Sequence, residues 1–392
     1  MNKGCRLKAE LLSYGVRMSD EAIRRFSAPY LVKRRAYSNT DSEEFLAIDT
    51  PQEIIIMPEG IVVGVTLNHT SPLCIDWADG RFFLRSAEGT ADWLSDITFT
   101  LRPSFYGMEL TGGIRAESVL TYIFGHTLGI FVNTSCFFAA PGYQCKYCSI
   151  RANAMRPEDN MHTVTEEAAV AAVCRAVTLA PEDIDLVFIS GGNFADRNKN
   201  FLYYSSLALA IKRTLRSLAP SVEVVLNVFP PDDLSLTERL RGSGINVLVS
   251  TEVFSPEGYA YHCPGKSGIL PKARLYEVLD KYLDVCGPFH VYSIVIQGLE
   301  PPESLIRGIR EYAARGVCTV VNVLHVDPGT ELAAEGIAHP TVAQILQVAD
   351  ALQAVYREYG FDTRKIYGGR NSFDAECSRG LLLCEEKADD KQ

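Results

Sequence analysis

From about residue 128 onward, the sequence alternates between short apolar runs and amphipathic segments. The apolar runs predict strands at 128–134, 185–190, 222–229, 245–252, 290–297 and 318–326. Most of these runs are apolar nearly throughout, which is typical of strands that are covered on both faces. The segments between them predict helices, such as the one in which Thr163 and Glu166 have capping-box spacing. This alternation predicts parallel βα units.

The number of βα units indicates whether the barrel is closed or open. Six βα units fit between residue 128 and about residue 335, whereas a closed barrel needs eight. We therefore expect an α/β protein whose main domain, residues 126–335, is an open, partial (βα)6 TIM-type barrel.

The two flanking regions have different patterns. Residues 1–125 predict a mostly β appendage, in which Asp79-Gly80 between apolar runs signals a hairpin. Residues 336–392 predict one helix that begins at the capping-box pair Thr341 and Gln344 and stops at Gly360. A lid-like tail follows that helix.

Composition narrows the class of partner. The 392 residues carry a formal net charge of -10 without a stripe of lysine or arginine, which disfavours nucleic acid and favours a small molecule or peptide. No apolar run reaches the roughly 18 residues needed to cross a bilayer, so no membrane contact is expected. The 11 cysteines are an odd number and no signal peptide opens the sequence. We expect a reduced, cytoplasmic protein.

Three cysteines gather directly after the first predicted strand, at Cys136, Cys145 and Cys148, with eight and then two residues between them. In parallel α/β folds, ligands bind at the carboxyl ends of the strands, so this loop is expected at the barrel mouth. A structural zinc site would need a fourth protein ligand, and a thioredoxin-like pair would leave one cysteine unexplained. A 4Fe-4S cluster with one open iron uses all three thiols. We favour the cluster and keep zinc and a redox pair as alternatives.

The cysteine loop resembles the radical S-adenosylmethionine (radical SAM) superfamily. The usual family spacing is three residues and then two, whereas this chain has an atypical Cys-x8-Cys-x2-Cys motif. Tyr147 directly precedes the last cysteine, where the family usually carries an aromatic near the adenine. The resemblance implies that Cys136, Cys145 and Cys148 hold a 4Fe-4S cluster.

Further matches lie at the predicted strand ends. The second strand ends in a turn that is similar to the family's Gly-Gly-Glu turn for the methionine amino group, formed by Ser190, Gly191, Gly192 and Asn193, with Asn193 in place of the acid. Glu252, after the fourth strand, and the turn from Val295 through Gly298 to Glu300, after the fifth, are similar to the biotin-synthase and thiazole-tyrosine-lyase branch. Glu252 or Arg274 is expected to hold the methionyl end of the cofactor.

The resemblance implies reductive cleavage of S-adenosyl-L-methionine to a 5'-deoxyadenosyl radical, which abstracts hydrogen from a small-molecule substrate. The candidate reactions are carbon-carbon cleavage or rearrangement, methylation, or sulfur insertion, in a cofactor or natural-product pathway. The implied electron donor is a reduced flavodoxin- or ferredoxin-type protein. We expect the β appendage and the tail to cover the barrel mouth, because such a radical must be kept from water and competing hydrogen donors.

The loop after the fourth strand supplies candidates for substrate chemistry. His262 and Lys266 are candidates for binding an anionic substrate, and Cys263 for donating hydrogen or binding metal. A well-packed loop with an incidental thiol is the alternative. Arg370, Asn371 and Cys377 are candidate lid contacts, and an auxiliary cluster would draw on Cys263, Cys377 and Cys384.

A second class of function stays open. A zinc- or iron-sulfur-bearing barrel that binds a partner without catalysis would need a fourth protein ligand, and the candidates are His126 and Cys263.

Overall fold

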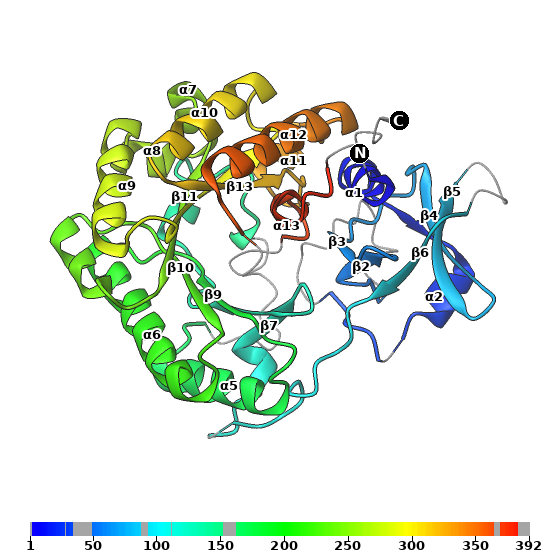
Figure 1. The fold of residues 1–392 in the computed structure, drawn as a ribbon, viewed down its shortest axis with the longest axis horizontal. Helices are drawn as coiled ribbons and strands as arrows, with labels where there is room; N and C mark the ends of the chain where they lie inside the picture. The colour runs from blue at the N-terminus through cyan, green and yellow to red at the C-terminus, as the bar shows by residue number, and fades with distance from the viewer. Residues whose placement is uncertain are drawn as a thin grey trace, which may run out of the picture.

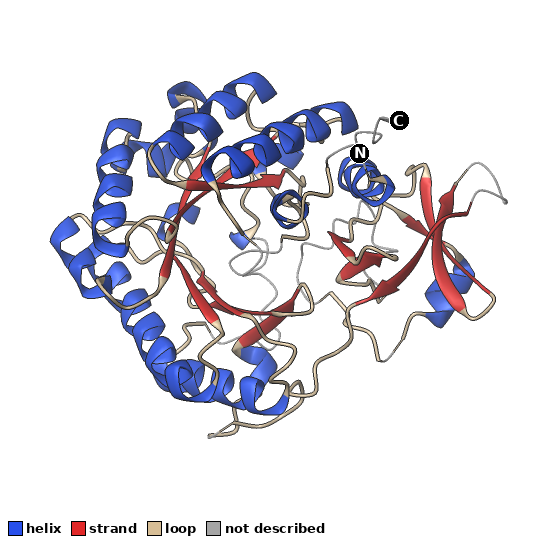
Figure 2. Cartoon of the chain, in the orientation of Figure 1, coloured by secondary structure: helices blue, strands red, loops and turns tan. Residues whose placement is uncertain are grey.

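The computed structural model describes residues 2–27, 29–33, 49–87, 93–110, 112–151, 162–363 and 369–382. The described chain forms two sheets, one of six strands and one of seven, with most helices packed against the larger one (Figures 1 and 2). Cys384, one of the proposed auxiliary-cluster thiols, lies outside the described residues.

The larger sheet is a curled half-barrel that contains the six predicted strands. In chain order these are β8 (Thr127–Phe131), β9 (Leu186–Ser190), β10 (Glu223–Asn227), β11 (Asn246–Glu252), β12 (Val291–Gln297) and β13 (Cys318–Val323). Each pairs in parallel with the next, so the prediction of an open (βα)6 partial barrel is confirmed. A short strand that the sequence pattern did not predict, β7 (Leu120–Ile123), adds to β8 as an antiparallel edge.

Helices cover the convex face of this sheet, as Figure 2 shows. They are α5 (Glu166–Leu179), α6 (Arg197–Leu218), α9 (Lys272–Cys286), α10 (Pro302–Ala314) and α12 (Val342–Tyr359). The predicted capping box of α12 is confirmed, because Thr341 and Gln344 exchange both hydrogen bonds and Gly360 ends the helix in a left-handed conformation. The expected cap of α5 was two residues early: Thr165 is the N-cap, and its side chain accepts from the amide of Ala168.

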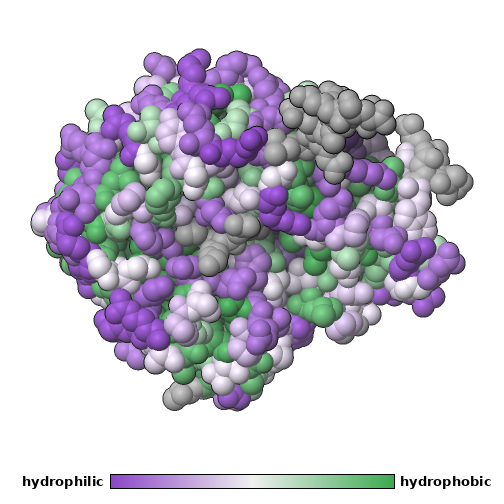
Figure 3. Space-filling view, viewed as in Figure 1, coloured by the Kyte–Doolittle hydropathy of each residue, from purple (hydrophilic) through white to green (hydrophobic). Residues whose placement is uncertain are grey.

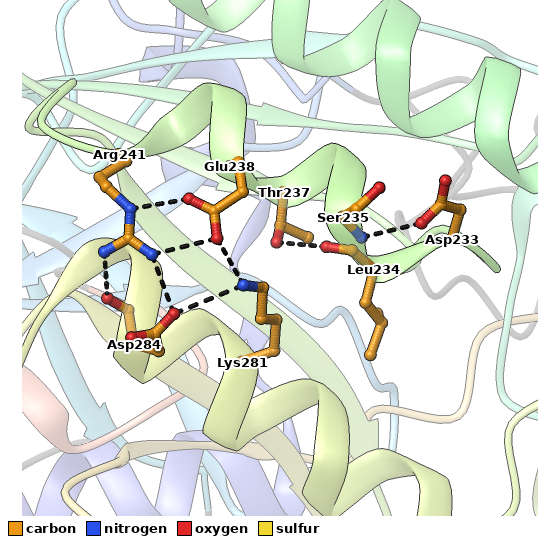
Figure 4. Close-up of polar contacts among 8 residues, drawn as sticks. All are labelled: Asp233, Leu234, Ser235, Thr237, Glu238, Arg241, Lys281 and Asp284. Carbon is orange, nitrogen blue, oxygen red and sulfur yellow. Dashed lines mark hydrogen bonds and ion pairs between the residues drawn. The ribbon is translucent and has the colours of Figure 1, made fainter.

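The connection between β10 and β11 is a 3-10 helix, η3 (Leu234–Leu240), rather than a full α-helix. It is fixed to α9 by a network of charges, in which Arg241 pairs with Glu238 and Asp284, and Lys281 pairs with the same two carboxylates (Figure 4). Every member of the network is at least partly exposed, so these pairs orient the segment and add little stability.

The smaller sheet has the order β1-β4-β5-β6-β2-β3. Its strands are β1 (Arg17–Met18), β2 (Glu53–Ile56), β3 (Ile61–Gly64), β4 (Leu73–Ala78), β5 (Arg81–Ser86) and β6 (Trp93–Phe99). The predicted hairpin is confirmed: β4 and β5 pair antiparallel, and both Asp79 and Gly80 have positive φ, as a tight two-residue turn requires. Two helices, α1 (Lys3–Tyr14) and α2 (Asp20–Arg25), accompany this sheet.

The smaller sheet lies at the open side of the half-barrel, and the C-terminal segment lies between the two (Figure 1). On one side, the amide of Val323 in β13 donates to the Asn371 carbonyl at 2.7 Å, and the amide of Gly64 in β3 donates to the Arg370 carbonyl at 3.2 Å. The tail therefore bridges the edges of both sheets before it forms α13 (Asp374–Ser378).

On the other side, the amide of Phe124, which follows β7, donates a hydrogen bond shared by both carboxylate oxygens of the buried Glu53 of β2. The smaller sheet thus contacts the larger one near both of its edge strands. This arrangement closes the open side of the half-barrel laterally.

Three more short helices lie in the described chain: α7 (Pro256–His262), α8 (Pro264–Ile269) and α11 (Glu331–Ala334). The 3-10 turns η1 (Ala116–Ser118) and η2 (Phe137–Ala139) lie among the loops. No helix in the described ranges is long and apolar enough to cross a membrane. Hydrophilic side chains are spread over the face shown in Figure 3, with apolar ones scattered between them.

Candidate cofactor site

The cysteine loop leaves β8 and is held by main-chain hydrogen bonds to the segments that follow three other strands. The amide of Phe137 donates to the Asn193 carbonyl after β9 at 2.7 Å, and the amide of Lys146 donates to the His262 carbonyl after β11 at 2.9 Å. After β13, the amide of Leu332 donates to the Lys146 carbonyl at 3.1 Å. The three cysteines therefore lie at the carboxyl edge of the sheet, where the sequence predicted them.

The turn after β9 packs so closely against the cysteine loop that its two central positions must be glycine. A Cβ atom on Gly192 would lie 1.7 Å from the carbonyl oxygen of Ser135, and one on Gly191, whose φ is +147°, would lie 2.9 Å from the Asn133 nitrogen. Only glycine allows the turn to approach the cysteine loop this closely. This contact therefore fixes the position of Cys136 relative to the end of β9.

The thiols differ in their electrostatic surroundings. A hydrogen bond from the Cys263 thiol lowers the pKa of Cys145, although burial acts in the opposite direction. Burial, followed by the nearby Cys145, raises the pKa of Cys148 to about 12. Cys136 is partly exposed, and its sulfur accepts a hydrogen bond from the Asn193 side chain at 3.8 Å. Of Cys145 and Cys148, Cys145 is therefore the one whose surroundings favour the thiolate, which is the form that binds metal.

The donor type of the loop suits an iron-sulfur cluster. Cys136, Cys145 and Cys148 supply three thiols in one loop at the carboxyl edge of the sheet, and thiolates are the ligands that 4Fe-4S clusters use. In the described part of the chain, no three His, Cys, Asp or Glu side chains form a group that could hold one metal ion. The assignment of these three cysteines as cluster ligands stays a prediction.

Glu252 ends β11 in a left-handed conformation, with φ of 49°. One of its oxygens forms a short ion pair with Lys266, and the other is buried without a hydrogen-bond partner among the described residues. Despite burial, the charges of Glu252, Cys145 and Cys263 raise the pKa of Lys266 well above its ordinary value. The unpartnered oxygen can accept a hydrogen bond from an ammonium or hydroxyl group, which suits the predicted contact with the cofactor.

The segment after β11 packs against the cysteine loop. Cys263 is fully buried beside Cys145, and the amide of Gly265 donates to the Tyr143 carbonyl of the cysteine loop at 3.2 Å. His262 is buried as well, burial lowers its pKa, and its Nδ1 has no hydrogen-bond partner among the described residues. Lys266 is already paired with Glu252, so its predicted contact with an anionic substrate stays a prediction.

Three residues that were predicted to contact the cofactor or the metal lie away from the cysteine loop. Arg274 lies on α9, on the helical layer, and contacts Glu277 and the Asp232 carbonyl, so it does not join the thiols. Val295 is buried in the main core, because alternate residues of a strand face opposite sides, and its neighbour Ile296 packs with Cys145 instead. His126, a suggested fourth ligand, precedes β8 and so lies at the opposite end of that strand from the cysteine loop.

The remaining residues that were predicted to contact the cofactor or to form the lid lie as follows. Tyr147 packs with the Cys145 group, and burial raises its pKa. Gly298 has φ of 109°, and a Cβ there would lie 2.7 Å from Pro340. Glu300 accepts from the amides of Phe254 and Ser255, so it fixes the start of the loop after β11. Among the candidate lid residues, Arg370 and Asn371 lie between the sheets, and Cys377 is buried against α12.

The sequence analysis named Ser190 but missed Asn227 and Ser250, which form an inward polar row with it. The Asn227 side chain of β10 donates to the Ser190 hydroxyl at 3.2 Å, and the Ser250 hydroxyl of β11 donates to Asn227 at 3.0 Å. All three are partly accessible although helices cover the other face of the sheet. A polar residue that ends an otherwise apolar strand run was the available signal.

The sequence analysis also missed the apolar residues that pack around Cys145 and Cys263. They come from the segments that follow several strands, and they are Val253, Tyr259, Leu299, Leu324 and Leu332.

No protein-family profile matches the chain. Among curated proteins, the bacteriochlorophyllide c C-7(1)-hydroxylase of Chlorobaculum limnaeum is 23% identical over 268 residues, which cover 64% of this chain and 65% of that protein. The match thus spans somewhat less than two thirds of the relative's length.

Solved structures with a related arrangement include a radical SAM methyltransferase from Sphaerobacter thermophilus, with a TM-score of 0.42, 16% identity and 76% of each chain covered. Coproporphyrinogen III oxidase from Escherichia coli, a radical SAM enzyme, has a TM-score of 0.37 and 14% identity, with 63% of this chain and 56% of that chain covered. The methyltransferase TsrM from Kitasatospora setae, solved with cobalamin and a [4Fe-4S] cluster, has a TM-score of 0.33 and 14% identity, with 50% of this chain and 37% of that chain covered.

Proposed function

We propose that this protein is a radical SAM enzyme that acts on a small organic molecule. The observation that carries the proposal is the loop with Cys136, Cys145 and Cys148, held at the barrel mouth by the ends of β9, β11 and β13. The lowered pKa of Cys145 and the unpartnered oxygen of Glu252 support it, because cluster binding needs thiolates and the cofactor needs an acceptor.

When bound, the cluster and S-adenosylmethionine would supply a 5'-deoxyadenosyl radical that abstracts hydrogen from the substrate. The residues of this chain bind and orient: three thiols hold the cluster, Glu252 accepts from the cofactor, and Tyr147 packs beside it. The smaller sheet and the tail exclude water from the open side, which such a radical requires.

The activity of the curated relative supports the proposed type of reaction. Hydroxylation of a bacteriochlorophyllide is a reaction at a carbon-hydrogen bond of a small molecule, which supports hydrogen abstraction as the first step here. We propose a place in a cofactor or natural-product pathway, with reduced flavodoxin or ferredoxin as the electron donor.

One observation favours a second candidate. Cys263 lies beside Cys145 and is a possible fourth thiolate, which would close the site and make the protein a non-catalytic metal- or cluster-binding module.

The deciding experiment is anaerobic reconstitution with iron and sulfide, followed by dithionite, S-adenosylmethionine and chromatography for 5'-deoxyadenosine. We expect bound iron and deoxyadenosine in the native protein, and loss of deoxyadenosine together with most cluster iron in Cys145→Ala. The control is Cys174→Ala, because Cys174 lies on α5 away from the cysteine loop. Loss of bound iron in Cys263→Ser, without deoxyadenosine from the native protein, would support the binding module. Stoichiometric zinc and no iron would contradict the radical SAM enzyme and support the zinc form of the binding module.

A further inference from the structure

Two segments of the candidate site run antiparallel and contact each other through their backbones. The amide of Gly265 donates to the Tyr143 carbonyl at 3.2 Å, and the amide of Lys146 donates to the His262 carbonyl at 2.9 Å. A Cβ atom on Gly265 would lie 2.5 Å from the Tyr143 carbonyl oxygen, so the two backbones touch directly. Each position between these two bonds therefore has a defined partner across the contact.

One cysteine from each segment lies between the two bonds, at opposed positions. Cys145 directly precedes Lys146 and Cys263 directly follows His262, so the antiparallel register places the two cysteines opposite each other. Both pack in the same buried apolar group, and their thiols interact with each other. Cysteines that face each other in this way can be joined with little movement of the backbone.

Three side chains hold the two segments together. The Lys146 ammonium lies 3.9 Å from the ring centroid of Tyr261 and pairs with Glu335 at 2.5 Å. The Tyr261 hydroxyl donates to the other oxygen of Glu335 at 3.0 Å. Because Lys146 belongs to the cysteine loop and Tyr261 to the end of α7, these contacts keep the two cysteines in register.

We propose that Cys145 and Cys263 form a reversible disulfide when the site carries no cluster and a peroxide is present. Peroxide oxidises the Cys145 thiol to a sulfenic acid and leaves as water. The Cys263 thiol then attacks that sulfur, a second water leaves, and the disulfide closes. Two thiols thus lose two hydrogens while hydrogen peroxide is reduced to two waters. Cys145 reacts first because it is 6% exposed, whereas Cys263 is 0% exposed.

The disulfide controls cluster assembly, a consequence that rests on the proposed function. The sulfur of a disulfide is not a thiolate, so Cys145 cannot bind iron until the bond is reduced. The bond also keeps Cys145 from further oxidation to the irreversible sulfinic and sulfonic acids. Cys263 thereby protects a cluster ligand, a role that requires no contact with substrate or metal.

The test maps disulfides in the full-length chain without cluster. The protein is reduced, freed of reductant under argon, treated with equimolar hydrogen peroxide, blocked with N-ethylmaleimide and digested with trypsin. Cleavage after Lys146 separates Cys145 from Cys148. Peptide mass spectrometry should find residues 116–146 linked to 242–266, about tenfold more than 116–146 linked to 147–151, because the first pair is already opposed. Dithiothreitol should return both thiols.

Controls assign the cross-link to the two cysteines. Cys136 lies on the same tryptic peptide as Cys145, so Cys136→Ser should keep the link. Cys263→Ser should lose it and accumulate sulfinic acid at Cys145, with circular dichroism checking that both variants remain folded. Cys318 of β13 is the internal control: it is equally buried, its thiol contacts Tyr356, and it should stay a free thiol.

Several results would overturn the proposal: a main product that links 116–146 to 147–151, a link that disappears in Cys136→Ser, or as much sulfinic acid at Cys145 in the native protein as in Cys263→Ser. Iron uptake is then measured before oxidation, after it and after dithiothreitol. We expect uptake to fall on oxidation and to return on reduction, and unchanged uptake would contradict control of assembly. The mapping itself uses no iron, so its outcome is independent of whether deoxyadenosine forms.

Discussion

At the scale of single residues, the tightest packing in the candidate site is between the Gly-Gly turn and the cysteine loop. The carbonyl of Ser135 occupies the place where a Cβ of Gly192 would lie. Neither partner is a flexible side-chain end, so the contact cannot be relieved by a rotamer change. The position of Cys136 thus depends on a residue that binds no metal itself.

Gly192→Ala is expected to destabilise the protein by about 2–4 kcal/mol, because backbone must move to accept the methyl group. The measurement is denaturant unfolding together with the iron content after reconstitution. Gly268→Ala is the matched control: a Cβ there meets nothing within 4 Å, so we expect a neutral or slightly stabilising effect. Equal behaviour of the two variants would contradict the packing argument.

The ion pair between Glu252 and Lys266 gives a second prediction at this scale. Glu252→Gln leaves Lys266, whose side chain is 12% exposed, without its buried counter-charge, so we expect a loss of about 2–4 kcal/mol in unfolding free energy. The double variant Glu252→Gln with Lys266→Met removes both charges and should recover part of that loss. A double variant less stable than Glu252→Gln alone would argue against a charge effect. Equilibrium unfolding in urea measures both.

At the scale of elements, the C-terminal helix α13 carries two buried acids, Asp374 and Glu376. Burial and the nearby Glu376 raise the pKa of Asp374 to about 8, while Lys8 acts in the opposite direction. The Ser372 hydroxyl donates to one oxygen of Asp374, and the other oxygen has no partner among the described residues. The helix that closes the tail over α12 therefore depends on the protonation of one side chain.

A pH dependence follows from this raised pKa. The folded state holds the Asp374 proton up to about pH 8, whereas the unfolded chain releases it near pH 4. The folded state thus binds more protons in this window, and the contribution of Asp374 to stability, complete below about pH 4, is lost as the pH rises through about 8. Asp374→Asn keeps the acceptor for Ser372 without titrating.

The unfolding free energy of Asp374→Asn should therefore increase relative to the native protein between about pH 4 and pH 8, by on the order of a few kcal/mol. Urea titrations across this range measure the difference. A difference that stays constant with pH would rule out a raised pKa at this site.

At the scale of the whole molecule, the smaller sheet and the tail close the half-barrel through a few buried polar contacts. Lys8 of α1 pairs with Glu376 of α13 at 2.9 Å, and both side chains are almost fully buried. Glu53 and the Arg370 segment make the corresponding links closer to the sheets. The first and last described helices are thereby tied together across 368 positions of the sequence.

Lys8→Met is expected to cost about 3–5 kcal/mol, because Glu376 is left as an uncompensated buried charge. Limited proteolysis should then cut the tail near α13 faster than in the native protein. Arg6→Met is the control in the same helix: its pair with Glu10 is exposed, so a change within about 0.5 kcal/mol is expected. Resistance of the Lys8→Met tail to protease would show that the closure does not depend on this pair.

Features of the fold that have local causes were predictable from the order of residues. Alternation of apolar runs and amphipathic segments predicted the six parallel strands, the Asp79-Gly80 turn predicted its hairpin, and Thr341 with Gln344 predicted the cap of α12. The same pattern located the cysteine loop at the carboxyl edge. Strand period, turn conformation and capping depend on residues within a few positions of one another, so they can be read from the chain.

Tertiary structure alone decided which distant residues meet. It brought Cys263 to Cys145 and Arg370 to Glu53, directed Arg274 to α9, and added β7 to the sheet. It also showed that Gly192 serves close packing with Ser135. These pairings depend on the side to which each strand residue faces and on how the smaller sheet docks. Packing across the whole molecule sets both, and no local pattern encodes it.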